Sequence, residues 1–141
     1  TANWTAAWPD PITTILFIFG CTQDKGQDNS SSTGVSFLNI KDGDTLTSPF
    51  LLKMGVEGMV LEPKGETKPD HGHHHLLIND GPIDKGLIIV ADSTHIHYGA
   101  GQSQDSVNLS PGNYKLTLQF ADGMHVSYGE EWSKTIQVTI K

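Results

Sequence analysis

The sequence lacks several features that define common classes of protein. It has one cysteine, Cys21, and therefore cannot form an internal disulfide. It has no cluster of Lys and Arg residues, and its formal net charge of −7 argues against a surface that binds nucleic-acid phosphates. No long stretch shows helical periodicity. The chain of 141 residues is thus acidic and suited to attract cations.

A membrane-spanning run is also missing. The run Ile12–Gly20 is shorter than the about 20 residues that a span requires, but it suits the apolar region of a signal peptide. Ile18-Phe19-Gly20-Cys21 resembles a bacterial lipoprotein processing box, in which the cysteine carries a lipid and becomes the mature N-terminus. We therefore expect residues 1–21 to be a lipoprotein-like leader with a truncated or misread start, since no Met, Lys or Arg precedes the run. The alternative is an apolar leader or edge strand with a buried free thiol.

Composition changes twice after the leader. Residues 22–34 (TQDKGQDNSSSTG) contain no large apolar side chain, which predicts a flexible linker. From residue 35 to residue 141, short apolar runs rich in Thr, Val and Ile alternate with turn residues, and the chain has 15 Gly and 7 Pro. This pattern favours an all-β chain, and its length of about 100 residues allows one domain with a single core.

Period-two alternation indicates several half-buried strands. Phe50, Leu52, Met54 and Val56 would form one face of a strand, and Ile136, Val138 and Ile140 would point inward from the last one. The continuous apolar run 87–90 is expected to be a buried strand or its edge. The expected strands lie near residues 35–40, 50–56, 73–78, 87–90, 94–98, 107–109, 114–120 and 136–140.

The segment Leu109-Ser110-Pro111-Gly112-Asn113-Tyr114 is the clearest indicator of the fold. A tyrosine that begins a strand after a Pro-Gly turn is typical of the tyrosine corner of immunoglobulin-like sandwiches, where its hydroxyl bonds back to the backbone. Alternate residues from Tyr114 to Phe120 would then face the core, and Lys115, Thr117 and Gln119 would face outward. We therefore predict an immunoglobulin-like antiparallel β-sandwich of about seven strands with Greek-key connections.

Histidines are concentrated in one place. Four of the seven histidines lie within residues 71–75, and the others are His95, His97 and His125. In a strand, His73 and His75 share one face, and His95 and His97 form a second pair of this kind. If the two strands are neighbours, these pairs and His125 supply enough imidazoles for a metal ion. The sequence thus predicts a copper or zinc site made of His73, His75, His95, His97 and His125.

Other side chains bear on which metal would bind and on which carboxylates would contact its ligands. Met59 or Met124 beside the imidazoles would favour copper, because a thioether suits Cu(I), although methionine more often fills gaps in a core. A ligating imidazole commonly donates its other N–H to a carboxylate. The candidates for this role are Asp70, Asp80, Asp92, Glu130 and Glu131.

Four segments carry a resemblance to a known family. GVEGM, GHHHLLI-D, THIHYGAGQ and LQFADGMH follow one another in this order before a terminal strand. Together they resemble a bacterial domain family of unknown function that occurs in secreted and lipid-anchored proteins. The resemblance covers residues 35–141 and implies an immunoglobulin-like sandwich in the cell envelope, as a periplasmic or outer-membrane lipoprotein. It implies no activity.

Three functions follow from these observations. The first is a copper- or zinc-binding protein of the envelope without catalysis, attached to the membrane only through a lipid on Cys21. The second is a zinc-dependent hydratase or hydrolase in which Glu130 or Glu131 acts as general base. The third is an adhesion or ligand-binding module whose histidines bond one another and the backbone.

Overall fold

The computed structural model describes residues 33–141, in which strands account for almost all regular structure. The leader, Cys21 and most of the expected linker lie outside the described residues. Within residues 33–141, no helix is long and apolar enough to cross a membrane. The elements are β1 (Gly34–Phe37), β2 (Thr45–Leu46), β3 (Phe50–Glu57), β4 (Val60–Leu61), β5 (His71–Ile78), β6 (His95–His97), β7 (Gln104–Val107), β8 (Gly112–Ala121), the 3-10 helix η1 (Glu130–Trp132) and β9 (Ser133–Ile140).

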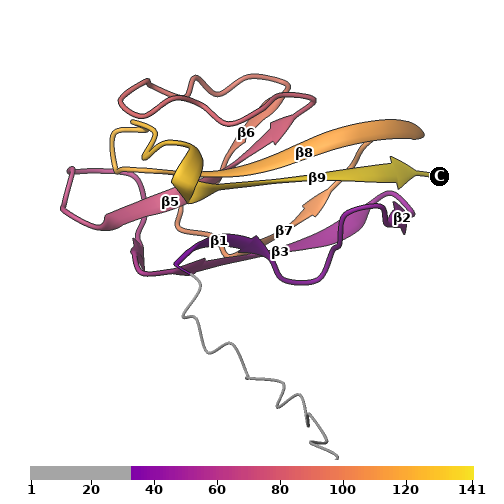
Figure 1. Ribbon diagram of the computed structural model, residues 1–141, viewed down its shortest axis with the longest axis horizontal. Coiled ribbons are helices and arrows are strands. Elements are labelled where there is room, and N and C mark those ends of the chain that lie inside the picture. Colours follow the sequence, from indigo (N-terminus) through magenta and orange to yellow (C-terminus); the bar gives the residue numbers. More distant parts are fainter. Residues whose placement is uncertain (1–32) are drawn as a thin grey trace, which may run out of the picture.

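The strands form two sheets that lie one above the other (Figure 1). The smaller sheet has the order β1-β3-β7, and the larger has the order β2-β9-β8-β5-β4, with β6 also paired to β5. The pairings are antiparallel except for the short pairs β2–β9 and β4–β5. The predicted all-β sandwich is thus confirmed. Seven of the described strands contain three residues or more, and β2 and β4 contain two each.

The main core fills the space between the sheets. Alternate residues of β3 and β9 point into it as predicted, including Leu52, Met54 and Val138. From β8 the buried side chains are Leu116, Leu118 and Phe120, which are fully inaccessible to solvent. Burial of one such side chain contributes about 1.5–3 kcal/mol. This core therefore fixes which faces of β5 and β8 point away from it.

The outer face of the larger sheet is covered as well, which the sequence did not predict. Residues 79–94 run over this face (Figure 1), and Ile89 packs there against Leu77 and Ala121. The run 87–90 was expected to be a buried strand or its edge, but it forms no strand, and Leu87, Ile88 and Val90 are exposed while Ile89 is buried. This segment makes a single bridge, between Ile88 and Val126. It acts as a cover that inserts one side chain.

The same covering segment lies over the face of β8 that carries two polar residues. Thr117 and Gln119 point outward from the core as predicted, yet both are fully buried. Gln119 accepts a hydrogen bond from the Ile83 N–H at 3.0 Å and donates to the Gly129 carbonyl at 2.9 Å. It thereby joins the segments before and after β8 over one face of the sheet.

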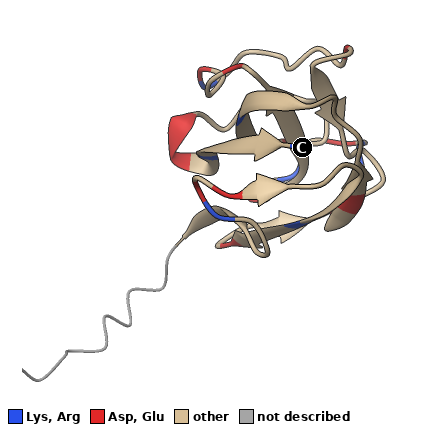
Figure 2. Ribbon diagram, turned by 90° about the vertical axis from the view of Figure 1, so that its right-hand side faces the viewer, with Lys and Arg blue, Asp and Glu red and all other residues tan. Residues whose placement is uncertain are grey.

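Charged residues lie mainly in turns and loops, and the short helix η1 carries the adjacent Glu130 and Glu131 (Figure 2). Among the described residues, Asp122 is the only buried Asp, Glu or Lys. A buried carboxylate costs free energy unless its oxygens are hydrogen-bonded. The burial of Asp122 therefore indicates that its carboxylate has a specific role in the structure.

The tyrosine corner is present. The Tyr114 hydroxyl donates to the Ser110 carbonyl at 2.8 Å, four residues upstream, as expected at the start of this strand. The ring of Tyr114 is partly buried and packs against the main core. Tyr98, by contrast, is 1% exposed, and its hydroxyl has no hydrogen-bond partner among the described residues.

These two tyrosines give a matched test of the fold. Tyr114→Phe removes a made hydrogen bond and should lower the free energy of unfolding by about 1 kcal/mol. Tyr98→Phe removes an unpaired buried hydroxyl and should leave stability unchanged or raise it by up to about 2 kcal/mol. Urea denaturation of both variants measures the difference. A Tyr98→Phe variant as destabilised as Tyr114→Phe would contradict this assignment of the hydroxyls.

Candidate metal centre

Strand pairing brings the two histidine pairs to the same face of the larger sheet. β5 and β6 are antiparallel neighbours, with His75 opposite His97 and Leu77 opposite His95. His73 and His75 point outward, on the side of Leu77, whereas His74 packs in a T-shaped contact against Phe120 in the core. The strand interpretation of the histidine run is therefore correct, including the face on which each side chain lies.

Four imidazoles meet at this position: His73, His75, His97 and His125. One nitrogen from each lies within 4.8 Å of those of the other three. His73 Nε2 is 3.0 Å from His97 Nε2 and 3.1 Å from His125 Nδ1. His73 and His75 are fully buried, and His97 and His125 are partly exposed. Within the histidine cluster, His73 and His75 from β5 are thus inaccessible to solvent, and the side formed by His97 and His125 reaches solvent.

The turn after β8 presents His125 to the cluster. The buried Asp122 organises this turn, because its Oδ1 accepts hydrogen bonds from Met124 N–H at 2.8 Å and Val126 N–H at 2.9 Å. His125 itself has φ 67, in the left-handed region that non-glycine residues rarely adopt. Such conformations persist only where the surrounding structure holds them, and they concentrate at functional sites.

A second loop joins the turns that follow β6 and β8. The loop from Glu62 to Asp70 donates a hydrogen bond from Lys64 N–H to the Gly99 carbonyl at 2.8 Å and one from Gly65 N–H to the Gly123 carbonyl at 3.0 Å. Gly99 lies directly against the ring of His97, so that a side chain there would collide with the imidazole. The position of the His97 ring therefore needs glycine at residue 99.

Burial disfavours the charged form of three histidines of the cluster. Desolvation, together with the neighbouring His97 and His125, lowers the pKa of His73 from 6.5 to about 4, against an opposing effect of the Asp122 carboxylate. Desolvation and the other imidazoles lower the pKa of His75 to about 2. The pKa of His97 is lowered as well, first by desolvation and then by His125. At neutral pH these residues therefore carry free nitrogen lone pairs, the form that binds metal.

Hydrogen bonds alone do not satisfy these nitrogens. An imidazole nitrogen carries either one hydrogen or one lone pair, so His73 Nε2 can pair with only one of its two neighbours. Neither ring nitrogen of His75 has a partner among the described residues. Four nitrogens around a tetrahedral zinc ion lie about 3.3 Å apart, given bonds of about 2.0–2.1 Å. A metal ion would accept the lone pair of one nitrogen from each imidazole of the cluster, and the residues present fit one.

The remaining histidines lie outside the cluster. His95 was predicted as a ligand, but its Nε2 is 3.0 Å from Asp80 Oδ2 and its Nδ1 is 3.2 Å from the Val90 carbonyl, so neither nitrogen is free. Its position opposite Leu77, two residues along the sheet, explains the difference. His71 Nδ1 contacts the Pro69 carbonyl, and His74 lies on the other face of β5. The predicted group of five thus becomes a group of four.

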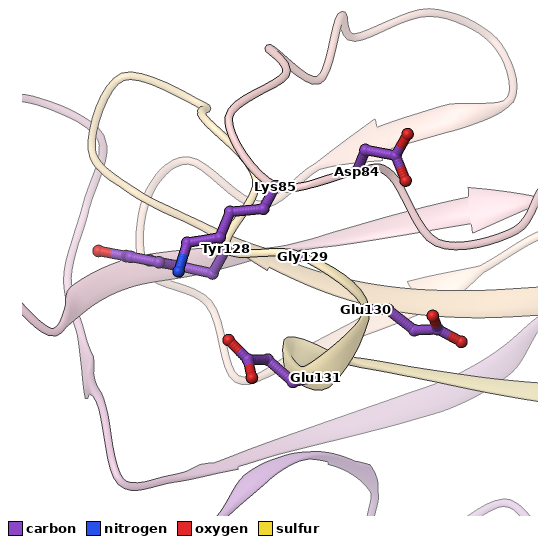
Figure 3. A pocket seen from close by; sticks show the side chains of 6 residues that line it. All are labelled: Asp84, Lys85, Tyr128, Gly129, Glu130 and Glu131. Atoms are coloured by element: carbon purple, nitrogen blue, oxygen red, sulfur yellow. The ribbon is translucent and has the colours of Figure 1, made fainter.

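The methionines and most of the proposed carboxylates also lie elsewhere. Met59 packs against the main core, and Met124 is 59% exposed. Asp80 and Asp92 bind His95 and the backbone around it. Glu130 and Glu131 line a separate pocket of about 260 Å³ with Asp84, Lys85, Tyr128 and Gly129 (Figure 3). No residue of the histidine cluster lines this pocket.

Asp122 and Gly99 support the cluster and were not predicted. The Asp122-Gly123 pair was a visible turn signal just before His125, and it could have indicated how that residue is presented. Gly99 follows His97 by two residues, but nothing in the sequence shows that its neighbour in space is an imidazole.

The fold and this cluster define a β-sandwich domain with four histidines on the outer face of its larger sheet. The chain belongs to the family described as a domain of unknown function (DUF4399), whose profile matches residues 52–141. No curated protein and no solved structure matches the chain. The predicted membership in a family of unknown function is therefore confirmed. A secreted or lipid-anchored nature stays a prediction.

The lowered pKa values predict how stability of the metal-free protein depends on pH. Unfolded histidines take up protons near pH 6.5, whereas folded His73, His74 and His75 do so only near pH 4 or below. The free energy of unfolding should therefore fall below pH 6.5, by up to about 1.4 kcal/mol per pH unit for each imidazole. Urea denaturation between about pH 7.5 and about pH 5 measures this loss.

His74→Leu serves as the control, because it removes one buried imidazole from the core and leaves the cluster in place. Its stability should depend less steeply on pH, by about one proton. Constant stability from pH 7.5 to pH 5 in the original chain would show that these imidazoles protonate freely in the folded state.

Proposed function

We propose that this chain is a transition-metal-binding protein of the bacterial cell envelope that holds one copper or zinc ion with His73, His75, His97 and His125. The observation that carries the proposal is His75, a fully buried imidazole with both nitrogens unpaired beside three others. A buried polar group without a partner costs about 1–3 kcal/mol. A bound metal offsets this cost because it accepts the lone pair of each ligand.

The ligand types limit the choice of metal. All four candidate ligands are imidazoles, whereas Met59 packs against the main core and Met124 is exposed. Imidazole sites suit Zn(II) and Cu(II), whereas thiolates and thioethers are the ligands that select Cu(I). The divalent ions are therefore the better fit.

Binding is better supported than catalysis. A hydrolytic zinc site needs a position open to water and a nearby general base. The proposed bases Glu130 and Glu131 line a different pocket. Asp122 Oδ1 already accepts hydrogen bonds from two backbone N–H groups. A module with purely structural histidines is disfavoured by the grouping of four imidazoles, whose nitrogens lie within 4.8 Å of one another.

The location rests on the lipoprotein-like box before Cys21. A lipid there would hold the domain at a membrane surface through the linker of residues 22–34. The acidic net charge of −7 would concentrate cations around such a domain. Both features agree with handling of metal ions in the envelope.

Titration of the tag-free chain with Zn(II) and with Cu(II) tests the metal site. We expect about one tightly bound ion per chain. His75→Ala and His97→Ala should each weaken binding beyond the about 10–100-fold that loss of an outer-sphere partner costs, because each removes a direct ligand. Isothermal titration calorimetry measures the affinity, and circular dichroism verifies that each variant is folded.

His71→Ala and His95→Ala are matched controls, since each removes a histidine of the same strands that lies outside the cluster. Both should bind as tightly as the original chain. Adventitious binding to the histidine run would instead give equal losses for His71→Ala and His75→Ala and no effect of His97→Ala, and this result would reject the site.

The location has its own test. Mass spectrometry of the protein purified from membranes of its native host should find a lipid on Cys21 and a mature chain that begins there. Cys21→Ser should release the protein into the soluble fraction, because it removes the acceptor thiol. A soluble, unmodified chain that begins at Thr1 would contradict the lipid anchor without affecting the metal site.

A further inference from the structure

Asp122 is a buried carboxylate without a counter-ion in the described part of the chain. It is 9% exposed, and no other Asp, Glu or Lys of residues 33–141 is buried. The ion pairs among these residues are formed by Lys68, His71 and His95, and none of them includes Asp122. Buried charges in proteins are usually paired with an opposite charge or coordinate a metal ion. Asp122 therefore lacks the cation that its burial calls for.

Hydrogen bonds compensate only one of the two carboxylate oxygens. Asp122 Oδ1 accepts from the Met124 N–H at 2.8 Å and from the Val126 N–H at 2.9 Å. Oδ2 has one contact among the described residues, the Thr67 hydroxyl at 3.4 Å. This distance exceeds the about 2.5–3.0 Å of an O–H···O hydrogen bond. The negative charge of Oδ2 is thus left to act on its surroundings.

The carboxylate lies beside two of the four candidate ligands. Asp122 directly follows Ala121, the residue opposite His73 in the pairing of β5 with β8. The two N–H groups that Oδ1 binds flank His125, whose own N–H donates to the Asp122 carbonyl at 2.9 Å. Desolvation and the neighbouring imidazoles lower the pKa of His73 to about 4, and the Asp122 carboxylate opposes this shift. The charge of Asp122 therefore reaches the histidine cluster.

We propose that the Asp122 carboxylate is the counter-charge of the metal ion in the histidine cluster and makes this site favour divalent over monovalent ions. The inference rests on the proposed metal site and gives Asp122 an electrostatic role rather than a bond to the metal. Imidazoles bind metal as neutral ligands, so Zn(II) or Cu(II) brings two uncompensated positive charges, whereas Cu(I) brings one. Coulomb attraction is proportional to charge, so at equal distance Asp122 attracts a divalent ion twice as strongly.

Asp122→Asn tests the charge without removing the hydrogen bonds. Its amide oxygen can still accept from the two N–H groups that Oδ1 binds, so the turn that carries His125 is kept. We expect the affinity for Zn(II) and Cu(II) to fall by about 10–100-fold and that for Cu(I) to fall less. A loss about tenfold greater for Cu(II) than for Cu(I) raises the reduction potential of the copper-loaded chain by about 59 mV. Competition titrations with chelators measure the affinities, and voltammetry measures the potential.

Thr67→Lys tests the same charge without altering Asp122. Thr67 is exposed and contacts Asp122 Oδ2, so a lysine there can neutralise this oxygen while Oδ1 stays bonded to the turn. The affinities and the potential should shift in the same direction as in Asp122→Asn. Asp84→Asn is the control, because it removes one negative charge from an exposed position on the covering segment, and it should change neither quantity.

Circular dichroism of the metal-free variants verifies folding, and Thr67→Lys decides the question if Asp122→Asn does not fold. Equal losses for Cu(II) and Cu(I) with an unchanged potential would show that Asp122 only shapes the turn. Unchanged affinities would show that its charge does not act on the metal. Either result overturns the proposal and leaves the metal site in place. An original chain that binds no ion would instead contradict the metal site, and this inference with it.

Discussion

The close approach of four imidazoles is the constraint on which the candidate site depends. Their nitrogens lie within 4.8 Å of one another, and two of the rings are fully buried. Protonation of His73 or His75 would place a charge beside the other imidazoles in a desolvated position, and the pKa of each is lowered accordingly. A metal ion is the partner that makes such an arrangement favourable.

Several layers of structure maintain this arrangement. The antiparallel register of β5 and β6 sets His75 opposite His97, and the core between the sheets fixes which face of β5 points outward. Asp122 shapes the turn that carries His125, and Gly99 leaves room for the ring of His97 close to the backbone. The segment 79–94 then covers the same face of the sheet. These contacts come from parts of the chain far apart in sequence, so the site requires the folded domain.

The sequence predicted those features of the fold that depend on local patterns of residues. Strict alternation identified β3, β8 and β9 and their inward faces, and the Pro-Gly turn before Tyr114 identified the corner. The spacing of His73, His75 and His97 likewise predicted their common face. His95 lies on the predicted face but outside the cluster, because period two specifies a face and not a position along the strand, and Asp80 from a distant loop contacts its ring. The role of 87–90 failed because apolar composition alone does not distinguish a buried strand from a cover with one inserted residue.

X-ray absorption spectroscopy of the Zn(II)-loaded full chain tests the central claim most directly, because it reports the ligands themselves. The account predicts a shell of about four nitrogen atoms at about 2.0–2.1 Å, with the outer-shell scattering of imidazole rings and no sulfur. The same spectrum is expected for His95→Ala. A shell dominated by oxygen, or one with fewer than three imidazoles, would contradict a site built from His73, His75, His97 and His125.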